Sequence, residues 1–270
     1  MASHPNTLSR FNITSLALGL AFLYLPIVIL VIYSFNASRL VTVWGGWSLR
    51  WYGELAGDAA ILDAAFNSLS IAVVSASAAT LIGVVAALAL FRLGRFRGRL
   101  VFASVICAPL VMPKVITGLS MLLLFVAIAV DRGFWTVVIA HTTMAMCLVA
   151  VIVRSRLVDF DLNLEEAAMD LGAPPLRTFL TVTLPLIAPA IAAAWMLAFA
   201  LSLDDVVIAS FATGPSVTTL PIHIYSEIHL GVKPEINAVC SIFIVVVGVA
   251  VLSASLLARR AGTRGIRARR

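Results

Sequence analysis

The chain has 270 residues, of which 61% are hydrophobic and only 12% are charged. Soluble globular domains carry about 25% charged residues, so this composition excludes a soluble domain and indicates an integral membrane protein. The formal net charge of +6 would suit a nucleic-acid-binding protein, but the basic residues lie in segments between apolar runs and form no single patch.

Six apolar runs are long enough to cross a bilayer, which takes about 20 residues of helix. They lie near residues 13–35, 66–91, 100–130, 134–153, 184–210 and 236–258. Helices satisfy their own backbone hydrogen bonds in lipid, and the alternating pattern of a membrane barrel is absent from the sequence. We therefore predict an all-α membrane protein with six transmembrane helices, forming a single domain over residues 1–270.

The basic residues are distributed unevenly between the two sides of this predicted bundle. With the N-terminus in the cytoplasm, fourteen lie in cytoplasmic segments and four in external ones. This positive-inside bias predicts that both termini are cytoplasmic. Topology and attraction to anionic lipid account for the arginines, so nucleic acid is not expected as a partner. The external residues are Arg39, Arg50, Arg132 and Lys233.

The first apolar run is too long for the core of a signal peptide, and we interpret it as an uncleaved anchor. An aromatic stretch follows it, with Trp44, Trp47, Trp51 and Tyr52. Two interpretations stay open: a belt of rings at the membrane interface, or an external surface whose ring faces contact a partner or a cationic solute. On the second interpretation, Trp47 is a candidate residue of a substrate pathway.

The next three runs carry different signals. The run 66–91 is rich in Ala, Ser and Gly, which predicts a helix buried among others. The run 100–130 contains Pro109 and Pro113, so we expect a kink or break there, with Lys114 beside it. His141 in the fourth run is interpreted as a packing or hydrogen-bonding side chain rather than a proton relay.

Two groups of potential metal ligands lack the pattern of a metal site. His223, Glu227 and His229 lie close together in the sequence, but a fourth ligand at a fitting spacing is missing. The three cysteines, all in apolar runs, have no pairing or metal-ligand spacing and are interpreted as small buried hydrophobes. We therefore expect neither a metal nor a disulfide. The cysteines are Cys107, Cys147 and Cys240.

The longest polar interruption, residues 154–183, predicts a compact helical unit. Asn163 is placed to cap a helix whose third residue is Glu166, and acidic residues near its start suit the helix dipole. Gly172 permits a left-handed C-terminal residue, and Pro174-Pro175 prevents continuation. A self-capped unit of this kind moves as a rigid body and can transmit a displacement.

The same interruption carries a spaced motif. Glu166-Ala167-Ala168 is followed after three residues by Gly172 and after nine more by Val182-Thr183-Leu184-Pro185. This pattern resembles the cytoplasmic signature loop of permease subunits in bacterial ABC importers, although Val182 stands where that family more often has Ile. The resemblance implies that a separate ATPase binds the loop. The implied coupling residues are Glu165, Glu166, Ala167, Ala168, Asp170 and Gly172.

The chain is not expected to hydrolyse ATP. A phosphate-binding loop needs Gly-Lys-Ser/Thr after glycines, whereas Lys114 and Lys233, the only lysines of the sequence, follow Pro113 and Val232. We therefore predict no catalytic residue and no cofactor on this chain, with ATP and Mg bound by a partner ATPase.

Asp204 and Asp205 are the only acids inside an apolar run. Intramembrane carboxylates are costly and indicate function, here the replacement of a cation's hydration shell; acids at a fraying helix end are the alternative. On a continuous helix, neighbouring residues point about 100° apart. Asp205 then shares the smaller, more polar face with Ser202, so Asp205 is predicted to line the pathway and Asp204 to support it.

A closer resemblance rests on several motifs over nearly the whole chain. The chain is similar to the second membrane subunit of bacterial putrescine/spermidine importers. The resemblance implies an inner-membrane heterodimer with a homologous permease, two copies of an ATPase and a periplasmic binding protein, moving polyamine inward by alternating access. The motifs are Arg50-Trp51-Tyr52, Pro109 to Pro113, Ser202-Leu203-Asp204-Asp205, Gly214-Pro215 and Thr218 to Pro221.

Lys114 departs from that subfamily, in which an acid is expected after Met112-Pro113. We expect its amine to be paired or to reach water, and an acid in its place to be tolerated or to raise uptake. Three alternatives remain open: a permease for another small cation, a secondary transporter, and an intramembrane aspartyl protease. Secondary transporters usually show repeated halves with two broken segments, whereas the sequence indicates one broken run and no matching repeat. The protease needs two facing carboxylates, whereas Asp204 and Asp205 are neighbours on one predicted helix and diverge.

Overall fold

The computed structural model describes residues 10–40, 43–94, 96–230, 234–249 and 252. Within these ranges the regular structure is helical, apart from an isolated bridge between Asn36 and Trp47. The chain divides into two compact units, which are described separately. The first comprises residues 1–59 and 227–249, and the second comprises residues 60–226 and 250–270.

The first unit contains α1 (Arg10–Tyr33), α2 (Arg50–Gly57) and the apolar helix Glu235–Val249. The loop between α1 and α2 is organised by Asn36, whose side chain donates to the Val43 carbonyl at 2.7 Å and accepts the Gly45 amide at 2.7 Å. Trp51 donates its ring N–H to the Asn36 carbonyl at 2.6 Å and is buried. Trp51 is therefore a core residue of this unit rather than part of an exposed aromatic belt.

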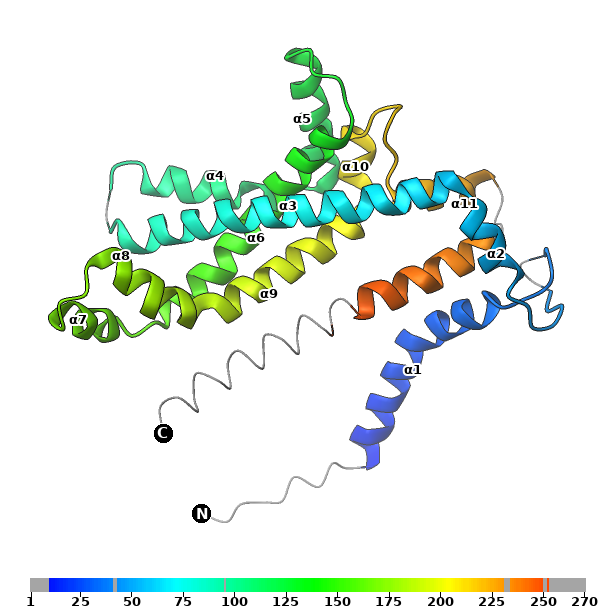
Figure 1. Ribbon diagram of the computed structural model, residues 1–270, viewed down its shortest axis with the longest axis horizontal. Coiled ribbons are helices and arrows are strands. Elements are labelled where there is room, and N and C mark those ends of the chain that lie inside the picture. Colours follow the sequence, from blue (N-terminus) through cyan, green and yellow to red (C-terminus); the bar gives the residue numbers. More distant parts are fainter. Residues whose placement is uncertain (1–9, 41–42, 95, 231–233, 250–251, 253–270) are drawn as a thin grey trace. The chain divides into compact units, whose positions relative to one another are not determined.

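The remaining elements belong wholly or largely to the second unit (Figure 1). The chain passes from a long helix through a bent pair to a central helix, then through a segment of short helices to the last long helix of this unit. The elements are α3 (Ala59–Arg92), α4 (Arg99–Val111), α5 (Lys114–Ala127), α6 (Phe134–Val158), α7 (Asn163–Asp170), α8 (Pro175–Thr178), the π-helical turn η1 (Phe179–Thr183), α9 (Leu184–Leu203), α10 (Val207–Ala212) and α11 (Leu220–Leu230).

Several helices are long and apolar enough to cross a membrane, which confirms a multi-pass, all-helical protein. They are Phe11–Tyr33, Ala59–Arg92, Phe134–Val158 and Pro175–Leu203, with the bent pair α4–α5 as a fifth candidate. The sixth expected span, residues 236–258, begins as the shorter helix Glu235–Val249 and extends beyond the described residues. Six spans and two cytoplasmic termini therefore stay predictions.

The α3 helix is buried along one side, as its small residues predict. Ala72, Ala76 and Ala79 are fully buried. At Gly83, an added Cβ would lie 2.8 Å from the Met146 carbonyl of α6, so the two backbones approach as closely as only glycine permits. Asn67 and Ser68 lie inside α3, which begins at Ala59.

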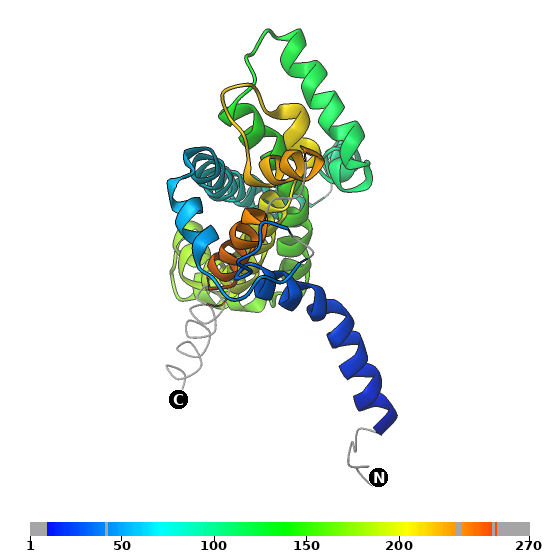
Figure 2. The ribbon, with the colours of Figure 1, turned by 90° about the vertical axis from the view of Figure 1, so that its right-hand side faces the viewer.

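The third apolar run is broken, as its prolines predict. The break falls at Met112 and Pro113, and α4 and α5 meet there at 112°. Pro109 lies inside α4. Figure 1 and Figure 2 both show α5 leaving the direction of α4 at this point.

The fifth apolar run is also broken, and the prediction of a continuous helix over 184–210 is wrong. Helix α9 ends at Leu203 and α10 begins at Val207. The Asp205 carboxylate accepts the backbone N–H of Ala209 at 2.9 Å, which satisfies a free amide of the new helix and favours a restart. The two broken segments pack together, since a Cβ at Gly118 of α5 would meet the ring of Phe211 of α10 at 2.5 Å.

Candidate functional site

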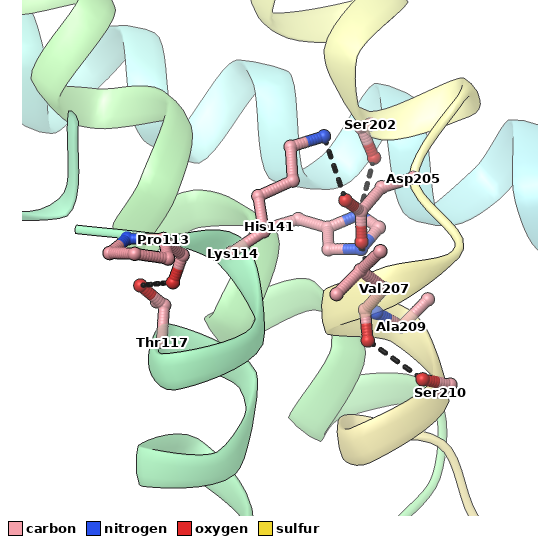
Figure 3. A network of polar contacts seen from close by, with 9 residues as sticks. All are labelled: Pro113, Lys114, Thr117, His141, Ser202, Asp205, Val207, Ala209 and Ser210. Carbon is pink, nitrogen blue, oxygen red and sulfur yellow. Dashed lines mark hydrogen bonds and ion pairs between the residues drawn. The ribbon is translucent and has the colours of Figure 1, made fainter. Parts of the chain in front are cut away.

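The two breaks are joined by an ion pair between Lys114, the first residue of α5, and Asp205, which lies between α9 and α10 (Figure 3). The Lys114 Nζ atom is 3.1 Å from Asp205 Oδ1. The Asp205 side chain is 1% exposed, whereas that of Lys114 is 42% exposed. The expectation that the Lys114 amine is paired is confirmed.

The second carboxylate oxygen of Asp205 is held from two other directions. Oδ2 accepts the Ala209 amide at 2.9 Å and lies 3.5 Å from Nε2 of His141, a buried residue of α6. Backbone, imidazole and ammonium thus surround one carboxylate. Because a buried charge is tolerated only when it is paired and hydrogen-bonded, this arrangement explains how Asp205 stays in an apolar setting.

A row of polar side chains continues behind His141. Its Nδ1 atom lies 2.7 Å from Ser202 Oγ, and Ser75 of α3 donates to Ser202 Oγ at 3.1 Å. When the Ser202 hydroxyl donates its hydrogen bond to Nδ1, Nδ1 is the acceptor and Nε2 carries the N–H that faces Asp205; this tautomer is assigned from the network. The interpretation of His141 as a hydrogen-bonding side chain is confirmed.

Asp204 differs from its neighbour. It is exposed, and within the described part of the chain its carboxylate has no recorded hydrogen bond or ion pair. The prediction that Asp205 lines the pathway and Asp204 supports it used the faces of a continuous helix, and the break removes that basis. The burial of Ser202 agrees with a place beside Asp205. The transport roles of all three residues stay predictions.

Trp47 lies in the first unit and is 73% exposed. Its ring meets that of Trp44 edge-on, with centroids 5.0 Å apart. The two rings form an exposed aromatic surface that can contact a solute or a lipid headgroup. Its predicted part in a pathway stays a prediction.

The predicted coupling segment, residues 154–183, contains α7. Gly172 has φ of +87°, the left-handed conformation that the sequence predicts for the end of this helix. The predicted cap is wrong: Asn163 is the first helical residue, and its backbone N–H donates to Asp161 Oδ1 at 3.1 Å. Asp161, two residues earlier, therefore accepts a free amide at the start of the helix, which is the role that the sequence predicts for Asn163.

Glu165 turns inward from α7. Its carboxylate accepts hydrogen bonds from the Arg92 guanidinium, at the end of α3, and from the Thr183 hydroxyl, at the end of η1. The Arg92 guanidinium also lies 5.5 Å from the ring centroid of Phe179. Glu165 thus ties the coupling helix to α3 and η1. Sequence reasoning missed Arg92, which it assigned only to topology.

The rest of the coupling segment offers an open surface. The remaining predicted coupling residues are exposed except Ala168, which is half-buried. Two leucines on either side of the turn are also strongly exposed, Leu171 by 90% and Leu176 by 71%. Apolar and acidic groups on one short unit are suited to docking on another protein. The exposed coupling residues are Glu166, Ala167, Asp170 and Gly172.

An open hollow of about 580 Å³ lies beside the α5–α6 and α10–α11 connections of the second unit. Asp131, Arg132 and Ser216 contribute polar groups to its lining. The two connections approach closely, because a Cβ at Gly214 would overlap the Arg132 carbonyl at 1.9 Å. Neither Lys114 nor Asp205 lines this hollow.

Comparison with known proteins gives consistent results. Residues 79–264 match the family described as "Binding-protein-dependent transport system inner membrane component". The putrescine transport system permease protein PotI of Escherichia coli K12 is 53% identical over 99% of this chain and 97% of its own length. The spermidine/putrescine transport system permease protein PotC of the same strain is 44% identical over 88% of this chain and 90% of its own length.

Solved structures agree on the fold. A bacterial ABC transporter involved in the import of the acidic polysaccharide alginate gives a TM-score of 0.72 at 18% identity, over 92% of this chain and 93% of that one. The MetNI methionine ABC transporter gives a TM-score of 0.62 at 17% identity, over 74% of this chain and 95% of that one. On the family match and the two relatives, this chain belongs to the binding-protein-dependent transport system inner membrane components.

Proposed function

We propose that the chain is the membrane permease subunit of an ATP-driven importer that carries a polyamine, putrescine and/or spermidine, from the periplasm to the cytoplasm by alternating access. The observation that carries this proposal is 53% identity to a putrescine permease over 99% of the chain. The second candidate is a permease for another small cationic solute, which the departure at Lys114 keeps open.

The proposed assembly contains several other chains. We place this subunit in the bacterial inner membrane as one six-helix domain with both termini cytoplasmic. It would form a heterodimer with a homologous permease, bind two copies of an ATPase and receive solute from a periplasmic binding protein. The chain itself would be non-catalytic, with ATP and Mg held by the ATPase. The family description and the uneven arginine distribution support this arrangement.

The proposed coupling works through α7. Glu166, Asp170 and the exposed leucines would contact the ATPase, while Gly172 gives the helix its sharp end. Glu165 would pass the displacement inward, because it is bonded to Arg92 of α3 and Thr183 of η1. From η1 the chain continues without interruption into α9, which ends beside Asp205.

The proposed pathway passes Asp204, Asp205 and Ser202, with Trp47 as a contact for the arriving cation. A carboxylate replaces part of the hydration shell that a polyamine loses in the membrane. Asp205 supports this role by its burial and fixed orientation, and Asp204 supports it by its exposure.

The test is uptake by the complete transporter in proteoliposomes. With loaded binding protein outside and ATP inside, labelled putrescine should accumulate, and unlabelled spermidine should compete. A matched preparation with a hydrolysis-deficient ATPase should show no accumulation. Accumulation without ATP would make the chain part of a secondary transporter, and uptake of a different cation in place of polyamines would favour the second candidate.

A further inference from the structure

Lys114 shows where an alkylammonium sits in this protein. Its side chain ends in a primary ammonium on a flexible four-carbon stem, the same chemical group that ends putrescine and spermidine. That ammonium lies 3.1 Å from Asp205 Oδ1, a normal distance for a charge-assisted hydrogen bond. The chain thus carries its own copy of the group that it is proposed to transport.

We infer that Asp205 Oδ1 binds the primary ammonium of the transported polyamine. In the absence of substrate the Lys114 ammonium occupies this binding site, and it leaves when substrate passes. This inference rests on the proposed function and adds to it a defined contact atom and a competing group within the chain.

The position of the Asp205 carboxylate does not depend on Lys114. Asp205 Oδ2 is fixed by the Ala209 amide at 2.9 Å and faces His141 at 3.5 Å, and His141 is bonded in turn to Ser202 at 2.7 Å. None of these contacts uses Oδ1. The carboxylate therefore keeps its orientation when the ammonium at Oδ1 is exchanged.

The two partners differ in access. The Asp205 side chain is 1% exposed, while that of Lys114 is 42% exposed and its amine reaches the carboxylate (Figure 3). Lys114 is the first residue of α5, directly after the break, so its stem is not enclosed by a preceding helical turn. An ammonium arriving from the side of Lys114 meets its amine before it meets Asp205.

Exchange of one ammonium for another keeps the local charge constant. A buried carboxylate left without a cation is strongly unfavourable, so substrate release from Asp205 would be slow if nothing replaced it. Return of Lys114 to Oδ1 supplies the replacement. The same group that competes with the substrate on arrival would thus help it to leave.

Chemical reactivity of Lys114 tests this inference directly. The complete complex is trapped with ATP and vanadate, with or without putrescine, and acetylated briefly; the modified lysines are then quantified by mass spectrometry. Lys114 acetylation should rise several-fold with putrescine, because the displaced amine becomes accessible. Lys233, the only other lysine of the sequence, is the internal control and should not change. In an Asp205→Asn complex, Lys114 should already react fast without putrescine.

A second measurement uses retention of labelled putrescine by the trapped complex. Lys114→Met, which removes the competing charge at similar length, should raise retention several-fold, and Lys114→Arg should stay near wild type. Equal Lys114 reactivity with and without putrescine, or lower retention in Lys114→Met, would make the ion pair a structural latch and overturn the inference. Failure of the proposed function is recognised separately, because wild-type proteoliposomes would then not accumulate putrescine at all.

Discussion

Two pairs of neighbouring acids in the second unit follow the same rule. In Glu165-Glu166 of the coupling helix and in Asp204-Asp205 between α9 and α10, one acid turns inward and the other is exposed. The inward acid binds a cation from a distant helix: Arg92 of α3 for Glu165, and Lys114 of α5 for Asp205. In each pair, one acid binds a cation within the chain and its neighbour is exposed.

The two ion pairs differ in how deeply the acid is buried, and this difference determines how much each ion pair contributes to stability. Arg92 and Glu165 are 39% and 13% exposed, so water screens them, and such pairs contribute about 0–1 kcal/mol. Lys114 is about as exposed as Arg92, at 42%, but its acid, Asp205, is 1% exposed, and a buried charge that loses its partner is strongly unfavourable. The outer ion pair, Arg92–Glu165, therefore orients α7. The inner ion pair, Lys114–Asp205, determines whether the buried charge of Asp205 is balanced.

Lys114→Asp should have the largest effect, because it converts the inner pair into two facing carboxylates. We expect putrescine uptake to fall by more than about a hundredfold and the complex to lose thermal stability, since like charges near a buried acid are strongly unfavourable. The sequence alone favoured tolerance of an acid here, and the observed pairing with Asp205 reverses that expectation. Uptake and melting temperature should be measured beside Lys114→Arg, and wild-type values for Lys114→Asp would contradict the role of the pair.

Asp205→Asn should come next. The amide preserves size but removes the charge, and a hydrogen bond to a charged group contributes about 1.5–3 kcal/mol, so uptake should fall by about one to two orders of magnitude. Asp204→Asn is the matched control at the exposed acid and should do less. The reverse ranking in initial uptake rates would assign the pathway contact to Asp204 and leave Asp205 a structural role.

Reversal of the outer pair should have a moderate effect on coupling. Arg92→Glu or Glu165→Arg should reduce the stimulation of ATP hydrolysis by loaded binding protein a few-fold, with normal membrane insertion, because α7 loses its contact with α3. The double exchange, Arg92→Glu with Glu165→Arg, should restore part of the stimulation. If the double variant is no better than the single ones, the contact between these two side chains does not carry the coupling.

Much of this fold follows from local signals in the sequence, but the inward acids do not. Pro113 predicts the break between α4 and α5, and Gly172 predicts the left-handed end of α7. The break at Asp204 has neither Pro nor Gly; it depends on a carboxylate that caps α10 and on the packing of α10 against α5. Arg92 and Glu165 are 73 residues apart, and Lys114 and Asp205 are 91 apart. Only the folded chain selects which acid of each pair meets its cation.

Gly172→Ala should have the smallest effect. It tests the segment that contains α7 without changing Glu165 or Glu166. Gly172 has φ of +87° and an added Cβ would meet no atom within 4 Å, so the substitution adds backbone strain but no clash. A left-handed residue other than glycine costs about 1–2 kcal/mol, which should loosen the end of α7 and lower the stimulated ATPase rate by about twofold. Gly172→Asn should do less, because Asn tolerates this conformation. Equal loss in both variants would show that the ATPase contacts the glycine itself, and that the shape of the turn is not what matters at this position.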